Sequence, residues 1–440
     1  MSHKPDPNKS VNLTIDGIPV TVPEGTRILE AAKKANIKIP TLCEHPDLCK
    51  RAICRICVVE CDGRGKLVAA CANDVWEGVS VVTNNLRLLD IRKTIIELIL
   101  SNHPQDCVSC VRNKKCELQT LSADFGIRES SFGRIEDTAK PVIESGTIVR
   151  NMDKCVKCGR CVEACQEEQT IRAINTSRRS HDYGISAPYK QSLEESPCVF
   201  CGRCAAVCPV GAIYEHDTTA EVWASINDGG RRTIAQISPE LTLDGCGTGK
   251  IITALKQLGF DKVFDASVSE QISNSELNAE LKQRLSAGGK GKLPMITGNI
   301  EGVYRFVNHF YPSLADHLAV GRNPRRIFSE EIRGKYAEEE KADVSAITPV
   351  SFVPGIAGKY GAGGKTDFAL TSEELARMIS LAGINIAKLA ESSFDTVKVD
   401  APKGGVDAQK EIVRGFAQAR KVLETVLNGE FASQWIEIEV

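Results

Sequence analysis

The beginning of the chain alternates apolar and polar positions in short runs. Residues 11–22 alternate on either side of Asp16 and Gly17, which predicts two strands joined by a tight turn. Residues 26–36 place apolar side chains on one helical face and predict a helix. Residues 86–102 repeat this spacing and predict an amphipathic helix packed on the loop that follows. The apolar positions of this second helix are Leu88, Ile91, Ile95, Leu98 and Ile99.

Beyond residue 220 the pattern changes to strands that alternate with helices. Residues 233–239 predict a buried strand, residues 249–258 a helix that ends at Gly259, and residues 262–265 the next strand. This alternation predicts a parallel sheet. The glycine-rich segment before the helix lacks the first glycine of a phosphate loop and the Ser or Thr after its lysine, so we interpret it as a helix start.

Composition places the chain among ordinary globular proteins with several domains. It has 440 residues, of which 42% are hydrophobic and 25% charged. A formal net charge of -2 gives no argument for nucleic acid or a membrane surface as a partner. The first residues are polar and no apolar run is long enough to span a membrane, so we expect a cytoplasmic protein without a membrane span.

Cysteine is distributed very unevenly along the chain. Seventeen of the 18 cysteines precede residue 210, and Cys246 alone lies in the C-terminal half. In a long intracellular chain, such clustered spacing is typical of metal ligands rather than of disulfides.

Two cysteine quartets share the spacing C-x2-C-x2-C-x3-C of a two-cluster bacterial ferredoxin. In that pattern three thiolates of one loop bind one cubane, and the fourth binds the other. Structural zinc is the alternative, but zinc sites use two pairs of ligands, whereas triplets with a displaced partner favour cubanes. We assign one [4Fe–4S] cluster to Cys155, Cys158, Cys161 and Cys208. We assign a second to Cys165, Cys198, Cys201 and Cys204.

An earlier loop carries cysteines with the spacing Cys43-x10-Cys54-x2-Cys57-x13-Cys71. This spacing resembles the [2Fe–2S] ligand set in the large iron–sulfur subunit of respiratory complex I and in complex [FeFe]-hydrogenases. The hairpin and helix before the loop resemble the β-grasp fold of plant-type ferredoxins. The resemblance implies a [2Fe–2S] cluster on Cys43, Cys54, Cys57 and Cys71. Cys49 and Cys61 are left over, and we interpret them as ordinary thiols, because free cysteine usually behaves as a small hydrophobe.

Only three cysteines, Cys107, Cys110 and Cys116, follow the helix predicted over residues 86–102. His103 lies at the end of that helix, although a lone histidine is more often an ordinary core or surface residue. Complex I and complex hydrogenases hold one [4Fe–4S] cluster by a histidine and three cysteines, so the resemblance implies His103 as the fourth ligand. A neutral imidazole carries one negative charge fewer than a thiolate, and we expect it to raise the reduction potential.

The second half of the chain resembles the catalytic domain of [FeFe]-hydrogenases. The resemblance rests on residues 249–265, 293–312 and 371–379. The resemblance implies the same fold for this half. Together with the resemblances of the cysteine-rich first half, it covers nearly the whole chain.

The resemblance fails where that family binds its active-site cluster. The family motif T-S-C-C-P-x-W matches residues 297–303, where Asn299 and Ile300 replace both cysteines. The motif M-P-C-x-x-K matches residues 353–358, where glycine replaces both the cysteine and the lysine. The third motif has no counterpart, because no cysteine follows residue 246. An empty pocket would destabilise the domain, so we expect Ile300 and Ile356 to have collapsed into it and left a packed platform that buries one side of the Cys198–Cys208 module.

The predicted fold class is therefore a multidomain α+β protein. We expect a β-grasp [2Fe–2S] domain over residues 1–85 and a histidine-ligated [4Fe–4S] domain over 86–145. A two-cluster ferredoxin domain follows over 146–220, and a truncated hydrogenase-like α/β domain without an active-site cluster over 221–440. Together they would hold one [2Fe–2S] and three [4Fe–4S] clusters on fifteen cysteines and one histidine.

The resemblance implies an electron-relay subunit without catalytic residues or hydrogenase activity. The chain is similar to the hydrogenase-like subunit of Stn-type electron-bifurcating, ferredoxin-dependent transhydrogenases, whose reaction links NAD(H), NADP(H) and ferredoxin. FMN or FAD and NAD(P) would lie on partner chains, a flavoprotein subunit and a small [2Fe–2S] subunit, because no dinucleotide fingerprint occurs here. The alternatives are a relay subunit of a formate dehydrogenase or bifurcating hydrogenase complex, and a non-catalytic redox sensor or scaffold.

Overall fold

The computed structural model describes residues 6, 8–49, 51–62, 66–133, 142–179, 183–286, 292–361, 367–397 and 408–440. Its chain divides into two compact units. The first comprises residues 1–145, 149–196 and 203–214, and the second comprises 146–148, 197–202 and 215–440. No helix among the described residues is long and apolar enough to cross a membrane.

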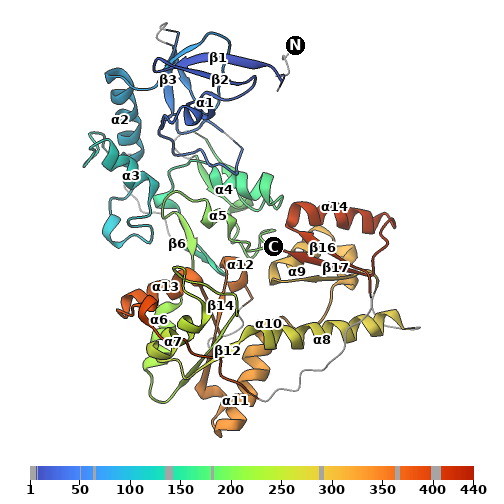
Figure 1. Ribbon diagram of the computed structural model, residues 1–440. Coiled ribbons are helices and arrows are strands. Elements are labelled where there is room, and N and C mark those ends of the chain that lie inside the picture. Colours follow the sequence, from blue (N-terminus) through green and yellow to red (C-terminus); the bar gives the residue numbers. More distant parts are fainter. Residues whose placement is uncertain are drawn as a thin grey trace. The chain divides into compact units, whose positions relative to one another are not determined.

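The first unit begins with a five-stranded sheet in the order β2-β1-β5-β3-β4 (Figure 1). Asp16 and Gly17 both have positive φ, as a tight hairpin turn requires, which confirms the predicted strand pair. β1 pairs parallel with β5, as the β-grasp prediction expects. The strands are β1 (Ser10–Ile15), β2 (Ile18–Pro23), β3 (Val58–Cys61), β4 (Lys66–Ala69) and β5 (Ser80–Val82).

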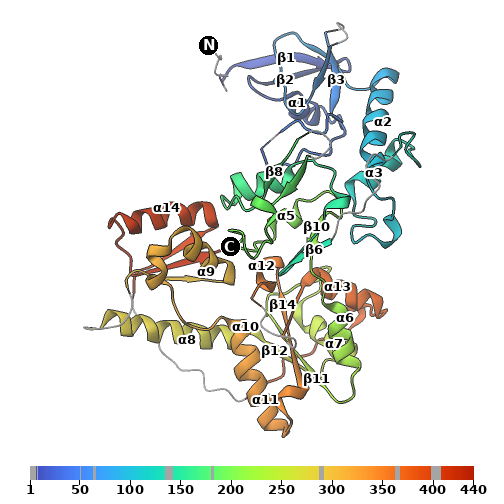
Figure 2. The same cartoon turned by 180° about the vertical axis from the view of Figure 1, so that it is seen from behind.

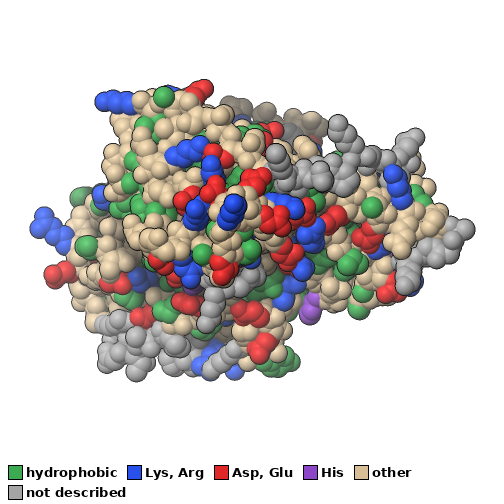
Figure 3. Space-filling model, turned by 90° about the horizontal axis from the view of Figure 1, so that it is seen from below, with side chains coloured by type: hydrophobic (Ala, Val, Ile, Leu, Met, Phe, Trp, Pro, Cys, Tyr) green, Lys and Arg blue, Asp and Glu red, His purple; other side chains and the backbone are tan. Residues whose placement is uncertain are grey.

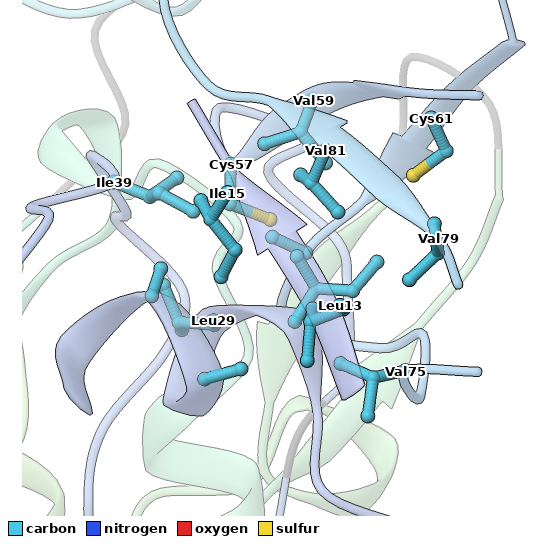
Figure 4. Close-up of a cluster of buried hydrophobic side chains, with 14 of the residues drawn as sticks. Leu13, Ile15, Leu29, Ile39, Cys57, Val59, Cys61, Val75, Val79 and Val81 are labelled. Carbon is cyan, nitrogen blue, oxygen red and sulfur yellow. The ribbon is translucent and has the colours of Figure 1, made fainter. Parts of the chain in front are cut away.

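A helix packs across this sheet and closes its core. α1 (Ile28–Lys34) begins two residues later than predicted, because Arg27 is still extended. Figure 4 shows Leu29 of this helix facing Leu13 and Ile15 of β1. The sulfur atoms of Cys57 and Cys61 lie in the same cluster of buried side chains.

The helix predicted after the sheet is confirmed as α2 (Leu86–Ser101), which Asn85 caps. Its buried face is rotated from the predicted one, since Leu88, Arg92 and Ile96 are buried while Leu98 is 49% exposed. Arg92 can lie in the core because it donates to the backbone carbonyls of Val58 and Thr83, at 2.6 and 2.9 Å.

Short helices and strands flank the remaining cysteines of the first half. The cysteines themselves lie largely in the loops between these elements, which have three to eight residues each. The helices are α3 (Glu117–Asp124), α4 (Arg160–Glu163) and α5 (Arg203–Ala206). The strands are β6 (Val142–Ser145), β7 (Ile148–Asn151), β8 (Asn175–Ser177), β9 (Gly184–Ser186) and β10 (Ile213–Glu215).

The second unit contains the predicted parallel sheet, in the order β12-β11-β14-β15. Helices α6, α7 and α13 cover one face, and α8 and α11 contribute to the cover of the other (Figure 2). The strands are β11 (Arg232–Ile237), β12 (Lys262–Asp265), β14 (Ile347–Val353) and β15 (Phe368–Thr371). The helices are α6 (Thr219–Asn227), α7 (Thr248–Leu258), α8 (Ala266–Leu285), α11 (Arg333–Glu340) and α13 (Ser372–Leu381).

A second, three-stranded parallel sheet has the order β13-β17-β16. Phe306 of α9 packs against Phe416 of α14, with ring centroids 4.9 Å apart, and both rings are fully buried. The strands are β13 (Met295–Gly298), β16 (Lys410–Arg414) and β17 (Trp435–Glu439). The remaining helices are α9 (Glu301–Phe310), α10 (Pro324–Ile327), α12 (Ile356–Lys359) and α14 (Phe416–Leu427).

Charged side chains of both signs are interspersed over the face drawn in Figure 3. Hydrophobic side chains are scattered among them. On this face the described residues form no broad field of one charge that would attract a polyanion.

Candidate iron–sulfur sites

The four cysteines predicted to hold the [2Fe–2S] cluster come together in the first unit. A hydrogen bond from Cys54 lowers the pKa of the Cys43 thiol to about 6, and the same contact raises the pKa of Cys54. A hydrogen bond between Cys57 and Cys71 likewise lowers the pKa of Cys57 to about 7 and raises that of Cys71. The charges of Cys43 and Cys54 also act on Cys71, so the two pairs lie within electrostatic reach of each other.

The loop that carries these thiols presents backbone amides to sulfur. Ala52 and Arg55 adopt positive φ, and the Cys54 N–H donates to Sγ of Cys43 at 3.4 Å. Such amide donors stabilise the charge of a thiolate and tune the cluster that it binds. Of the two leftover cysteines, Cys49 is exposed, whereas burial raises the pKa of Cys61 to about 11 in the sheet core.

The cysteines assigned to the first cubane also lie together. Burial raises the pKa of Cys158 to about 12, and the charges of Cys208 and Cys155 act in the same direction. Burial raises the pKa of Cys161 far above its usual range, and Cys155, Cys158 and Cys208 add to that rise. Bound iron would remove this penalty, because it supplies the positive charge that several buried thiolates need.

The cysteines assigned to the second cubane are divided between the two units. Cys198 and Cys201 belong to the second unit, and Cys165 and Cys204 belong to the first. The loop from Cys198 nevertheless repeats the backbone of the loop from Cys155. Phe200 and Gly202 have φ of 54° and 76°, and Lys157 and Gly159 have φ of 56° and 82°. In each loop an N–H donates at 3.4 Å to the first sulfur, from Lys157 to Cys155 and from Phe200 to Cys198. The repeated loop therefore suits the same kind of ligand.

His103 faces a cavity of about 560 Å³ that Cys107 and Cys116 also line. Burial lowers the pKa of the His103 imidazole, which favours the neutral form that binds metals. Its Nδ1 atom is buried and has no hydrogen-bond partner. A Cβ at Gly211 would lie 2.8 Å from Sγ of Cys110, so glycine leaves room for the third thiol. These observations therefore favour His103 as a cluster ligand over His103 as an ordinary core residue.

Among the described residues, no three His, Cys, Asp or Glu side chains converge closely enough to hold a single metal ion. Ligands of an iron–sulfur cluster bind different iron atoms and therefore span a wider space than the ligands of one ion. The four ligand sets remain predictions.

The positions that correspond to the hydrogenase active site carry no thiol. Asn299 follows β13 and pairs with the backbone of Val440, donating from Nδ2 at 3.5 Å and accepting at Oδ1 at 3.1 Å. Gly355 is the N-cap residue that precedes α12, and an added Cβ there would meet no atom within 4 Å. Ile356 packs on Gly202, since a Cβ there would lie 2.5 Å from its own Cβ.

The expectation that this domain is packed throughout is wrong. A cleft of about 950 Å³ lies within the second unit, with Glu301, Tyr304, Arg325 and Tyr360 among its lining residues. Ile300 and Ile356 do not line it. Lys359, next to the glycine that replaces the family's lysine, is buried in an ion pair with Glu374 at 2.7 Å.

The second unit holds the loop from Cys198 to Gly202 through contacts that the sequence did not predict. Arg305 of α9 donates to the carbonyl of Cys198 at 2.9 Å and to the hydroxyl of Tyr360 at 3.2 Å. The Tyr360 ring stacks on Phe200 with centroids 4.0 Å apart. Gly302 allows this approach, because a Cβ there would lie 2.3 Å from the carbonyl oxygen of Val199. These contacts provide part of the burial that was expected for one side of the Cys198–Cys208 module.

Comparison with protein families finds four matches along the chain. Residues 8–86 match a 2Fe-2S iron-sulfur cluster binding domain, and residues 92–131 match the NADH-ubiquinone oxidoreductase-G iron-sulfur binding region. Residues 139–212 match a 4Fe-4S dicluster domain. Residues 231–410 match the C-terminal domain of the iron only hydrogenase large subunit. These matches confirm the predicted fold class.

Similar proteins include several redox subunits. The NADP-reducing hydrogenase subunit HndD of Solidesulfovibrio fructosivorans is 35% identical over 88% of this chain and 71% of its own. Iron hydrogenase 1 of Clostridium pasteurianum is 31% identical over 87% of this chain and 70% of its own. The NADPH-Fe(3+) oxidoreductase subunit alpha of Geobacter sulfurreducens is 34% identical over 46% of this chain and 24% of its own.

Replacing His103 tests its assignment as a ligand. We expect His103→Cys to retain the cluster and lower its reduction potential, because a thiolate adds a negative charge. We expect His103→Ala to weaken iron retention at this site by more than about tenfold, as loss of a directly bound ligand should exceed the effect of losing an outer-shell partner.

The measurement is redox titration followed by electron paramagnetic resonance, with iron analysis of the same samples. His309→Ala is the matched control, since His309 is exposed on α9. If both variants at position 103 leave every redox signal unchanged, His103 is not a ligand.

Proposed function

The chain belongs to the iron-only hydrogenase large-subunit family, and we propose that it relays electrons within a multi-subunit NAD(P)H oxidoreductase complex without being a hydrogenase itself. One contrast carries the proposal. The cysteines that suit iron–sulfur clusters are present in the first half of the chain, whereas Asn299, Ile300 and Gly355 occupy positions where the family anchors its active-site cluster.

The relay depends on how the protein presents its ligands. When bound, the clusters would supply sites that each take up and release one electron. Cys43, Cys54, Cys57 and Cys71 would hold the first cluster, and His103, Cys107, Cys110 and Cys116 the second. Cys155, Cys158, Cys161 and Cys208 would hold the third, and Cys165, Cys198, Cys201 and Cys204 the fourth. Five of these cysteines are buried and the other ten are half-buried. Backbone amides donate to the sulfur atoms of Cys43, Cys155 and Cys198, which would stabilise the added negative charge.

The finer proposal concerns the complex in which the relay operates. HndD is by its name a subunit of an NADP-reducing hydrogenase, and the Geobacter relative is a subunit of an NADPH-dependent oxidoreductase. These names support a subunit of an NAD(P)-linked redox complex, and we propose that the complex is an electron-bifurcating transhydrogenase. A flavoprotein subunit would bind NAD(P) and FMN or FAD, a small [2Fe–2S] subunit would accompany it, and ferredoxin would exchange electrons with the complex.

The complex purified anaerobically from its native source tests this function. We expect it to contain a flavoprotein partner and to couple oxidation of NADH or NADPH to reduction of ferredoxin, measured by absorbance. Removing the flavin should abolish the coupled reaction while leaving the iron of this chain in place. A complex that contains a molybdopterin enzyme and oxidises formate would contradict the proposal.

Co-expression with hydrogenase maturation proteins tests the absence of hydrogenase chemistry. We expect no evolution or oxidation of hydrogen and no carbonyl or cyanide bands in the infrared spectrum, because no thiolate is present to anchor the active-site cluster. An [FeFe]-hydrogenase matured in the same cells provides the positive control. Hydrogen turnover or infrared bands from this chain would show that it loads an active-site cluster by other ligands.

A further inference from the structure

Arg160 lies between two predicted cluster ligands, in the run Cys158-Gly159-Arg160-Cys161. Although it is charged, only 4% of its surface is exposed. Its guanidinium donates to both carboxylate oxygens of Glu117, at 2.6 and 2.7 Å. It also donates to the backbone carbonyl of Glu44, at 2.7 Å. A buried arginine with two charge-assisted bonds of this length is held firmly in one place.

Each residue in this contact is the immediate neighbour of a predicted ligand. Glu44 follows Cys43 of the [2Fe–2S] loop, Glu117 follows Cys116 of the histidine-ligated loop, and Arg160 itself precedes Cys161 of the first cubane. One guanidinium therefore connects the ligand loops of three clusters. All three loops belong to the first unit.

The positive charge of Arg160 lies beside the ligand loops of two clusters. Arg160 stands in the chain between Cys158 and Cys161, and its guanidinium donates to the carbonyl of Glu44, which follows Cys43. At the third loop its partner is the carboxylate of Glu117, whose negative charge offsets that of the guanidinium. The arginine therefore favours the more negative state of the clusters on Cys43 and Cys158.

We propose that Arg160 is a positioning residue that fixes three cluster loops against one another and raises the reduction potentials of the clusters on Cys43 and Cys158 together. On reduction each cluster gains one electron and no bond is formed or broken, so its negative charge increases by one. A nearby cation stabilises that charge, and it does so more strongly in a buried site than in water. The inference rests on the proposed relay function and its ligand sets.

Arg203 provides an internal comparison, because it occupies the same place in the second motif, Cys201-Gly202-Arg203-Cys204. Its side chain is 29% exposed, and it donates to Glu168 at 2.8 Å and Asp47 at 3.2 Å. Neither partner adjoins a predicted ligand. Of these two arginines, Arg160 is therefore the one that contacts residues next to the ligands of other clusters.

The test uses the full chain, reconstituted anaerobically, with the variants Arg160→Gln, Glu117→Gln and Arg203→Gln. Redox titration followed by electron paramagnetic resonance gives the reduced-to-oxidised ratio of each cluster at a fixed solution potential. Cys43→Ser and Cys158→Ser assign the signals of the two clusters by the shift that each causes.

For Arg160→Gln we expect the ratio of both clusters to fall about tenfold, which is a shift of about 59 mV for one electron. For Glu117→Gln we expect the ratio to rise at both, because the partner charge that offsets Arg160 is removed. Arg203→Gln should leave these two clusters unchanged. Shifts of opposite sign at positions 160 and 117 support an electrostatic role, since a purely structural contact would loosen in the same way in both variants.

The proposal is overturned if Arg160→Gln retains its iron and shifts neither cluster, or if both variants shift the clusters in the same direction. If Arg160→Gln does not load iron, the test rests on Glu117→Gln alone. A reduced-to-oxidised ratio of the two clusters that is unchanged or lower in Glu117→Gln then overturns the proposal. A wild-type chain that lacks iron at these sites would instead contradict the ligand sets, which separates failure of the proposed function from failure of this inference.

Discussion

Bringing several cysteine thiols into one buried place is the constraint on which this structure depends. Burial raises the pKa of Cys158 and Cys161, so the thiols resist the ionised form that binds iron until positive charge arrives. The protein lowers this cost in two ways. Backbone amides donate to sulfur at Cys155 and Cys198, and a buried arginine lies between Cys158 and Cys161. Bound iron would supply the remaining charge, which would couple cluster binding to folding.

The hydrogenase-like domain has the fold of its family, whereas Asn299, Ile300 and Gly355 stand at the motif positions predicted for cysteine. Its two parallel sheets are intact, and its first and second family motifs still begin helices α9 and α12. Those helices now contact the loop from Cys198 through Arg305, Gly302 and Ile356. Such contacts would order the loop and place a cation beside the carbonyl of a predicted ligand. Under the proposed function, this gives the domain a structural role that needs no catalyst.

Local patterns predicted much of the fold, because they depend on neighbours in the sequence. The hairpin at Asp16 and Gly17 and the helix that ends at Gly259 follow from turn and capping preferences. The buried face of α2 was predicted only in part. Leu88 is buried and Ile95 and Ile99 pack against the core beside Cys116, as expected. Arg92 was missed because it counts as polar in a periodicity, although its hydrogen bonds allow it to be buried. Ligand spacing likewise identified thiols that the structure brings together in the first unit.

Long-range contacts could not be predicted in this way. Arg160 meets Glu117 and Glu44, and Arg305 meets the carbonyl of Cys198, across many residues of intervening chain. The spacing of residues along the sequence does not identify a hydrogen-bond partner so far away. The cleft in the second unit was missed for the same reason, since it is lined by segments that are distant in the sequence.

Iron analysis of the native protein decides whether the chain is a four-cluster relay without a terminal catalyst. We expect about fourteen irons per chain with matching sulfide, the content of one [2Fe–2S] and three [4Fe–4S] clusters. About ten irons or fewer after full reconstitution would contradict the four clusters. About twenty irons would contradict the missing catalyst, because that total leaves room for a complete hydrogenase active-site cluster.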